Sequence, residues 1–163
     1  MIKDISLGFN HAIALTDANQ VFVWGRRMGI YPNIELNYNF LTGAATSHIP
    51  HVEINQDEPR LLRSNLIYYK IARIFTGPWN SALVTDNQQV LIQGDNQYGQ
   101  LSLGPQIGPL CKFFSNFMKV DFFEQNQLDV QQVSFTGGSS HFLCRDKVSD
   151  RNKLFSVGCN DFG

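Results

Sequence analysis

The sequence has few charged residues and almost no imbalance between their signs. Asp, Glu, Lys and Arg make up 17% of the 163 residues, and 13 Lys and Arg stand against 14 Asp and Glu, for a formal net charge of -1. Proteins that hold nucleic acid by its phosphates need clustered positive charge. The composition therefore argues against nucleic acid as a partner.

Cysteine pairs and long apolar runs are also lacking. Cys111, Cys144 and Cys159 are an odd number and include no C-x-x-C spacing, which argues against a disulfide framework and favours a reducing compartment. No apolar run approaches the roughly 18 residues that a membrane helix requires. Residues 1–5 lack the apolar core of a signal peptide. We therefore expect an intracellular protein with no membrane span.

What the sequence contains instead is a repeat. In the first copy Gly8 opens a hydrophobic run that closes at Gly25, 17 residues later. The second copy runs from Gly77 to Gly94 over the same distance, and Thr-Asp falls at the same offset in both. A looser third copy begins at 137–138 and closes at Gly158. Self-similarity of this kind is typical of repeat architectures.

Two aliphatic residues precede each opening glycine, at the same distances in the first two copies and displaced by one residue in the third. The pairs are Ile2 and Ile5, Ile71 and Ile74, and Val130 and Val133. Short runs of Val, Ile, Leu and Phe bounded by Asp, Asn and Gln turns predict β-hairpins. Because one such sheet cannot bury both of its faces, the copies are expected to stack, and a circular stack is a β-propeller.

One segment carries a family resemblance. Residues 94–104, Gly-Asp-Asn-Gln-Tyr-Gly-Gln-Leu-Ser-Leu-Gly, resemble the G-x-N-x-x-G-Q-L-G-L-G hallmark of the RCC1 (regulator of chromosome condensation) repeat, and only Ser102 departs from it. The segments 11–16 and 21–25 resemble the H-S-L-A-L-T and V-Y-x-W-G portions of the same repeat, and 158–163 begins the hallmark again.

The resemblance implies an all-β fold. We expect an arc of about two to three four-stranded blades of an RCC1-like β-propeller, which has seven blades when its ring is complete. The single repeat region 1–163 would divide into copies at about 2–49, 50–108 and 109–163. We also expect the chain to be a piece of a larger ring, because so few blades cannot close one.

The residues that define the repeat are expected to be structural. They are Gly8, His11, Gly25, Gly77, Gly94, Asn96, Gly99, Gln100, Leu101, Gly104, His141, Gly158, Asn160 and Gly163. His11 and His141 are interpreted as equivalent positions. Since a catalytic residue is rarely needed in every repeat, we expect them to tie turns together by hydrogen bonds.

Two groups are candidates for contact with a partner. Arg26 and Arg27 follow the end of a predicted strand, and Phe113, Phe114 and Phe117 lie in an aromatic-rich insertion. Exposed aromatic clusters often mark docking surfaces. Part of this insertion is equally expected to pack on its own blade.

Two short segments resemble ligand-binding sites but lack residues that such sites require. His48 and His51, with Glu53, lack the further ligands of a metal centre. Residues 137–140, Gly-Gly-Ser-Ser, lack the Lys and the helix of a phosphate-binding loop and are interpreted as a turn with a bulge. We expect no catalytic residue, no cofactor and no metal.

The expected function is that of a non-enzymatic protein–protein interaction scaffold within a larger protein or assembly. The alternative is part of a guanine-nucleotide exchange factor for a small GTPase, the activity for which the family is best known. The partners would be a small GTPase or neighbouring subunits of a large assembly. Other family roles, including ciliary ones, favour a cytoplasmic or cytoskeletal place over secretion and leave the nucleus and mitochondrion open.

Overall fold

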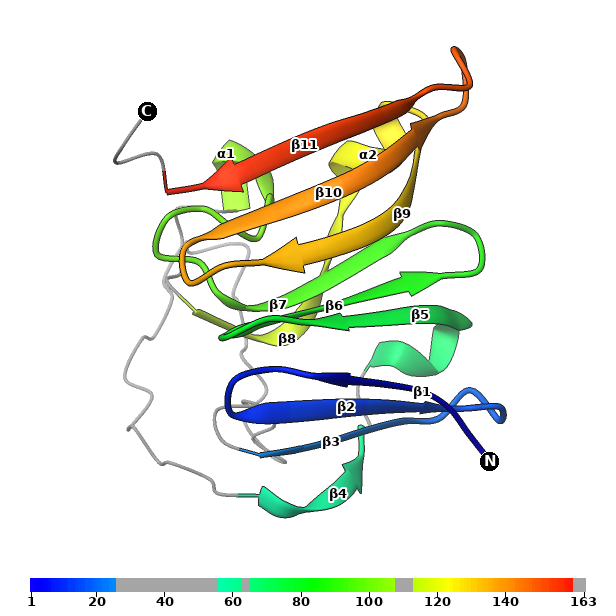
Figure 1. Ribbon diagram of the computed structural model, residues 1–163, viewed down its shortest axis with the longest axis vertical. Helices are drawn as coiled ribbons and strands as arrows, with labels where there is room; N and C mark the ends of the chain where they lie inside the picture. The colour runs from blue at the N-terminus through cyan, green and yellow to red at the C-terminus, as the bar shows by residue number, and fades with distance from the viewer. Residues whose placement is uncertain (26–55, 63–64, 108–112, 160–163) are drawn as a thin grey trace, which may run out of the picture.

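Three antiparallel sheets are stacked in chain order in the computed structural model, which describes residues 1–25, 56–62, 65–107 and 113–159 (Figure 1). Sheet A consists of β1 (Ile2–Leu7), β2 (His11–Thr16), β3 (Val21–Gly25) and β4 (Gln56–Leu61). Sheet B consists of β5 (Ile71–Thr76), β6 (Asn80–Thr85), β7 (Val90–Asp95) and β8 (Phe113–Val120). Sheet C consists of β9 (Leu128–Phe135), β10 (Ser139–Asp146) and β11 (Asn152–Gly158).

Helical structure in the described part of the chain is confined to single turns: η1 (Asn65–Tyr68), α1 (Gly104–Ile107) and α2 (Asp121–Gln125). Each sheet is a meander in which neighbouring strands follow one another in sequence. The prediction of an all-β arc of stacked blades is confirmed.

The hairpin of the third copy has the same strand pairing as those of the other two. The repeat begins earlier in the chain, however, than the glycine pattern of the sequence predicted. Across the hairpins, His11 pairs with Gly25, Asn80 with Gly94 and Ser139 with Gly158. The backbone N–H of Thr136 donates to the Ser139 carbonyl over 2.8 Å, as that of Gly8 does to His11 and that of Gly77 to Asn80. Thr136 therefore stands where the first two copies have their opening glycine.

This register corrects two sequence interpretations. Val130 and Val133 precede Thr136 at the distances seen in the other copies, so the expected displacement by one residue is wrong. His141 lies two residues beyond Ser139, and it is therefore not equivalent to His11. The adjacent pair Gly137–Gly138 suggested the wrong starting point; it forms the turn between β9 and β10.

The closing glycines occupy a position that admits no side chain. Gly94 has a φ of +118°, and a Cβ there would lie 2.2 Å from the Trp79 carbonyl oxygen. A Cβ on Gly25 would meet the carbonyl of Asn10 at the same distance. The hairpin backbones approach so closely at this corner that only glycine fits.

Two hydrophobic clusters hold the three sheets together. Between sheets A and B, the second and third strands of sheet A meet the first strand of sheet B. This cluster contains Ile13, Leu15, Val21, Val23, Ile71, Ile74, Leu83, Leu91 and Phe117. Each such side chain contributes about 1.5–3 kcal/mol when fully buried. Burial between the stacked sheets is therefore a major contribution to the stability of the fold.

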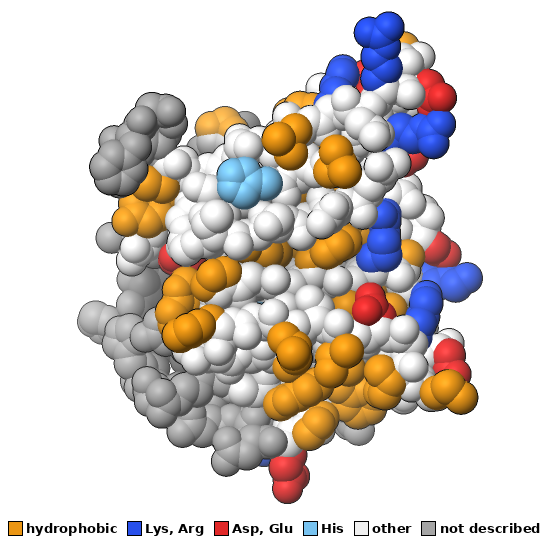
Figure 2. Space-filling view, viewed as in Figure 1, with side chains coloured by type: hydrophobic (Ala, Val, Ile, Leu, Met, Phe, Trp, Pro, Cys, Tyr) orange, Lys and Arg blue, Asp and Glu red, His pale blue; other side chains and the backbone are white. Residues whose placement is uncertain are grey.

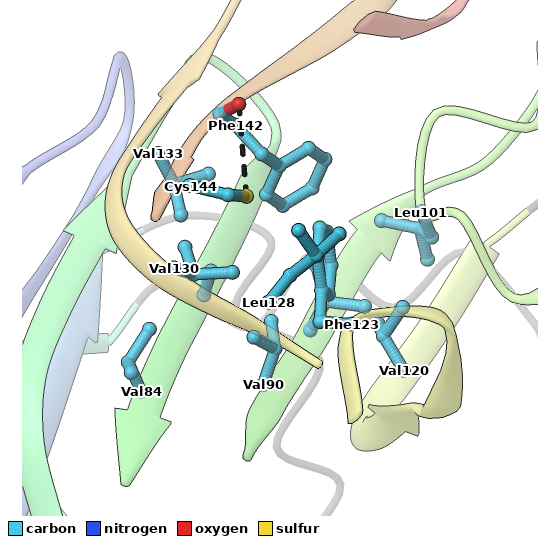
Figure 3. Close-up of a cluster of buried hydrophobic side chains, with 12 residues drawn as sticks. Val84, Val90, Leu101, Val120, Phe123, Leu128, Val130, Val133, Phe142 and Cys144 are labelled. Carbon is cyan, nitrogen blue, oxygen red and sulfur yellow. Dashed lines mark hydrogen bonds between the residues drawn. The ribbon is translucent and has the colours of Figure 1, made fainter. Parts of the chain in front are cut away.

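The cluster between sheets B and C repeats this arrangement (Figure 3). Val84 and Val90 of sheet B face Val130 and Val133 of sheet C, and Phe123 from α2 fills the space beside them. The wider cluster also contains Ala82, Ile92, Leu101, Val120, Leu128, Phe142 and Cys144.

Candidate partner-binding surface

A buried hydrogen bond joins sheets A and B at the beginning of their second strands, β2 and β6. His11 Nε2 lies 2.8 Å from Ser81 Oγ, and the two residues are 8% and 1% exposed. Burial lowers the pKa of His11, and a hydrogen bond with the Asn80 backbone opposes this shift in part. Gly8 leaves room for the ring, since a Cβ there would lie 2.5 Å from the His11 Cε1 atom. His11 therefore links two sheets as a neutral side chain.

A second polar pair reinforces this joint. Ser6 Oγ of β1 lies 2.8 Å from Thr76 Oγ1 of β5. Asn19, in the turn between β2 and β3, donates to the Tyr69 carbonyl and accepts from the Ile71 N–H. Sheet B is thus fixed against sheet A at both ends of β5.

The joint between sheets B and C uses different residues. Asn80 and Ser140 stand at the positions of His11 and Ser81, but within the described residues Asn80 Oδ1 and Ser140 Oγ are buried with no hydrogen-bond partner. Arg73 links these sheets instead, because its guanidinium donates to the carbonyls of Gln131 and Val130. Burial lowers the pKa of Arg73.

The hallmark loop that follows β7 is held by its own side chains. Asn96 Oδ1 accepts the Leu101 N–H over 3.0 Å, and Gln100 accepts the Tyr98 N–H and donates to Asp95 Oδ2. Leu101 is fully buried in the cluster between sheets B and C. The loop therefore helps to hold sheet B against sheet C through the buried Leu101 side chain.

Positive φ values mark three positions of this loop, at Gly99 (+76°), Ser102 (+56°) and Gly104 (+77°). Ser102, the one departure from the hallmark, thus occupies a left-handed position where the family pattern has glycine.

The other predicted residues lie apart from these joints. His141 Nδ1 lies 2.9 Å from Ser156 Oγ, within sheet C. Phe113 and Phe114 are half-buried at the start of β8. Phe117 is 2% exposed in the cluster between sheets A and B, so it belongs to the core and offers no contact surface. Outside the described residues lie Arg26, Arg27, His48, His51, Glu53, Asn160 and Gly163.

The described side chains offer little reactive chemistry. Across residues 1–25, 56–62, 65–107 and 113–159, no group of three or more His, Cys, Asp or Glu is placed to hold a metal ion. Burial raises the pKa of the Cys144 thiol to about 11, so this cysteine is a neutral thiol near pH 7. The Asp146 carboxylate accepts from Lys153 and from the N–H groups of Val148 and Ser149, which lowers its pKa.

The most exposed apolar surface of sheet A lies on its first strand. Ile2, Ile5 and Leu7, which we call the β1 face, are 56%, 54% and 70% exposed. Figure 2 shows hydrophobic side chains gathered over this strand. Phe9, in the next turn, is 74% exposed and meets the Trp79 ring edge-on at 5.6 Å.

Half of the exposed large hydrophobic residues of the described chain lie within the first nine residues. Sequence reasoning assigned no role to the β1 face. Ile2 and Ile5 precede their opening glycine at the same distances as Ile71 and Ile74 precede theirs. Because Ile71 and Ile74 are each 4% exposed, this spacing did not predict the exposure of Ile2 and Ile5.

None of the helices in the described residues is long and apolar enough to cross a membrane.

Known proteins are similar to this chain in sequence and in fold. Residues 2–26 match the family model of the regulator of chromosome condensation (RCC1) repeat. RCC1 domain-containing protein 1 of Mus musculus is 30% identical over 143 residues, which cover 87% of this chain and 33% of the mouse protein.

Two solved structures share the fold. Yeast RCC1 (Prp20), in its complex with Kap60, has a TM-score of 0.65 at 18% identity and matches 98% of this chain and 30% of its own. Prp20p of Saccharomyces cerevisiae, described together with its binding to Gsp1p and histones, has a TM-score of 0.59 at 16% identity and matches 98% of this chain and 33% of its own.

This chain spans about a third of the length of these relatives. The repeated hairpins, the hallmark loop and these likenesses agree: the chain belongs to the RCC1 repeat family and forms part of an RCC1-type β-propeller.

Proposed function

We propose that this chain is a protein–protein interaction scaffold that binds through the β1 face and carries out no chemistry of its own. The single observation that supports this most is the exposure of Ile2, Ile5 and Leu7 side by side on one strand. Contiguous exposed apolar residues mark interaction surfaces, because covering them gains about 25 cal/mol per Å² removed from water.

The use of the polar side chains supports the same proposal. His11, Ser81 and Arg73 are engaged in joints between sheets. A catalytic histidine would need access to a substrate, whereas His11 is 8% exposed and points at Ser81. We take the partner to be a protein inside the cell, such as a neighbouring subunit of a larger assembly.

Nucleotide exchange on a small GTPase is the alternative function. It requires a shaped contact face and few catalytic groups, so it is a special case of protein binding. Prp20p, which is described with its binding to Gsp1p, shares the fold with this chain at 16% identity. A nucleotide-release assay with a panel of small GTPases separates exchange from binding alone.

The test of the proposal compares two charge substitutions in the protein isolated from its native cells. Ile5→Asp places a carboxylate on the β1 face, whereas Val148→Asp places one at a residue that is 77% exposed in the turn between β10 and β11. We expect Ile5→Asp to lose bound protein partners and Val148→Asp to keep them. Equal sets of partners for the two variants and the wild type would refute the proposal.

A further inference from the structure

The turns that join the first and second strands of the three sheets lie at one end of the stack (Figure 1). Glycines let these turns approach closely. A Cβ on Gly8 would lie 2.5 Å from the Gly77 carbonyl oxygen, and a Cβ on Gly77 would lie 2.1 Å from the Phe135 Cβ atom. The exposed side chains of the turns are therefore neighbours across the sheets.

Three aromatic side chains lie at this end, and we call Phe9, Trp79 and Tyr98 the aromatic strip. Phe9 is 74% exposed and meets the half-buried Trp79 with ring centroids 5.6 Å apart and ring planes inclined by 65°. The Asp95 N–H donates to the Trp79 carbonyl, which places the hallmark loop beside that turn. Tyr98 of this loop is 50% exposed, and a Cβ on Gly138 would lie 3.2 Å from its Cδ2 atom. The strip thus extends from sheet A across sheet B to sheet C.

The two ends of the stack differ in charge. Every turn between the second and third strands, at the opposite end, contains charged residues, and Figure 2 shows Lys and Arg side chains along that edge. In the turns 8–10, 77–79 and 136–138 and the hallmark loop 94–104, Asp95 is the one charged residue, and its carboxylate accepts from Gln100 Nε2 and the Gln97 N–H. Phosphate-bearing ligands and acidic peptides need cations. The described residues of the aromatic end therefore suit an uncharged partner.

The spacing of the aromatic strip matches that of a proline-rich chain. Stacked sheets pack about 10 Å apart, so the contact of Phe9 with Trp79 and the contact of Tyr98 with sheet C are separated by about one sheet spacing. A polyproline II helix has three residues per turn and rises about 3.1 Å per residue, so prolines three residues apart lie on the same side, about 9 Å apart. Aromatic-lined surfaces bind such chains, because their preformed conformation loses little entropy on binding.

We propose that the aromatic strip binds an uncharged, proline-rich segment of a partner protein, which lies across the sheets in the polyproline II conformation. One proline ring packs against the inclined rings of Phe9 and Trp79, and the proline three residues further along packs on Tyr98. The Tyr98 hydroxyl can donate to a carbonyl of the segment, because a polyproline II chain has no internal hydrogen bonds. The strip contains no residue of the β1 face, so this binding is independent of the proposed function.

Fluorescence anisotropy with the full-length protein tests this inference. The probe is a capped, fluorescein-labelled peptide in which Pro-Ala-Ala is repeated four times, and a control peptide of the same composition has its prolines alternately two and four residues apart. We expect the control peptide to bind at least about tenfold more weakly than the probe. Phe9→Ala and Tyr98→Ala, at side chains that are at least half exposed, should each weaken binding of the probe about tenfold. Val148→Ala, at a 77% exposed residue of the opposite end, should leave it unchanged.

Other outcomes overturn the inference. Equal affinity for the two peptides would refute the match between the proline spacing and the sheet spacing. Binding of neither peptide, or binding that Phe9→Ala and Tyr98→Ala both retain, would refute the aromatic strip as the site. Self-association of the wild type that Phe9→Ala abolishes, measured by size-exclusion chromatography, would make a second copy the occupant. All of these results leave the β1 face untouched, because its test is the loss of protein partners in Ile5→Asp.

Discussion

His11 Nε2 lies 2.8 Å from Ser81 Oγ and joins the first two sheets through a buried hydrogen bond. The next sheets lack this bond although the backbone positions repeat: Asn80 replaces the histidine, and Ser140 keeps a buried hydroxyl with no partner among the described residues. The two joints are therefore matched tests of what a buried polar contact contributes to stacking.

Removing the serine hydroxyl should have opposite consequences at the two joints. Ser81→Ala leaves the buried His11 ring without its Oγ partner, which should lower the free energy of unfolding by about 1–3 kcal/mol. Ser140→Ala removes a hydroxyl that has no partner, so its effect should be close to zero or stabilising. Urea unfolding curves of both variants measure the difference, and equal destabilisation would contradict the assignment.

The stability of the fold should fall in mild acid because of His11. Burial lowers the pKa of His11 in the folded state below its ordinary value of about 6.5. Just below that pH, the unfolded state therefore binds more protons at His11 than the folded state does. The free energy of unfolding should therefore be highest above about pH 6.5 and decrease as the pH falls towards the folded pKa. In His11→Gln this part of the decrease should vanish; a curve that stays unchanged would exclude His11 as its source.

The single departure from the hallmark should be a destabilising one. Ser102 has a φ of +56°, a conformation that costs a residue with a Cβ about 1–2 kcal/mol and glycine little. Because glycine also loses more freedom on folding, Ser102→Gly should stabilise the chain by about 0.5–1 kcal/mol, measured as a higher urea midpoint. Gln97→Gly, in the same loop at a residue without positive φ, is the control and should not stabilise.

Glycines of the hairpins should differ sharply in their tolerance of a methyl group. At Gly94 the φ of +118° and the Trp79 carbonyl 2.2 Å from the added Cβ predict that Gly94→Ala costs more than about 2 kcal/mol. Apart from its two chain neighbours, no residue has an atom within 4 Å of a Cβ built on Gly137, and its φ is not positive, so Gly137→Ala should be nearly neutral. Thermal unfolding of the two variants measures how much stability each one loses. Similar losses in both would contradict the explanation by close backbone approach.

Local sequence patterns predicted the repeating hairpins because their determinants are local. Turn residues, aliphatic runs and the hallmark at 94–104 specify a hairpin and the loop that follows it, and none of them depends on another sheet. The third copy was misaligned for the same reason. Two adjacent glycines at 137–138 match the pattern better than Thr136, but hydrogen bonding between Thr136 and Ser139 decides where the turn begins.

The candidate surface could not be predicted from the residues that form it. Ile5 and Ile74 each stand three residues before the opening glycine of their repeat, yet they are 54% and 4% exposed. The difference depends on whether another sheet lies against the strand, which no local pattern encodes. Phe117 shows the converse, since its place in an aromatic-rich insertion suggested a contact surface, whereas β8 directs it into the cluster between sheets A and B.

The central claim is that a protein partner covers the β1 face. The rate at which a maleimide reagent labels the thiol of Ile5→Cys measures this directly, compared between the isolated chain of 163 residues and the protein in its native assembly. We predict rapid labelling in the isolated chain, where Ile5 is 54% exposed, and strong protection in the assembly. Equally rapid labelling in both would show that the face stays open to solvent and would contradict the account.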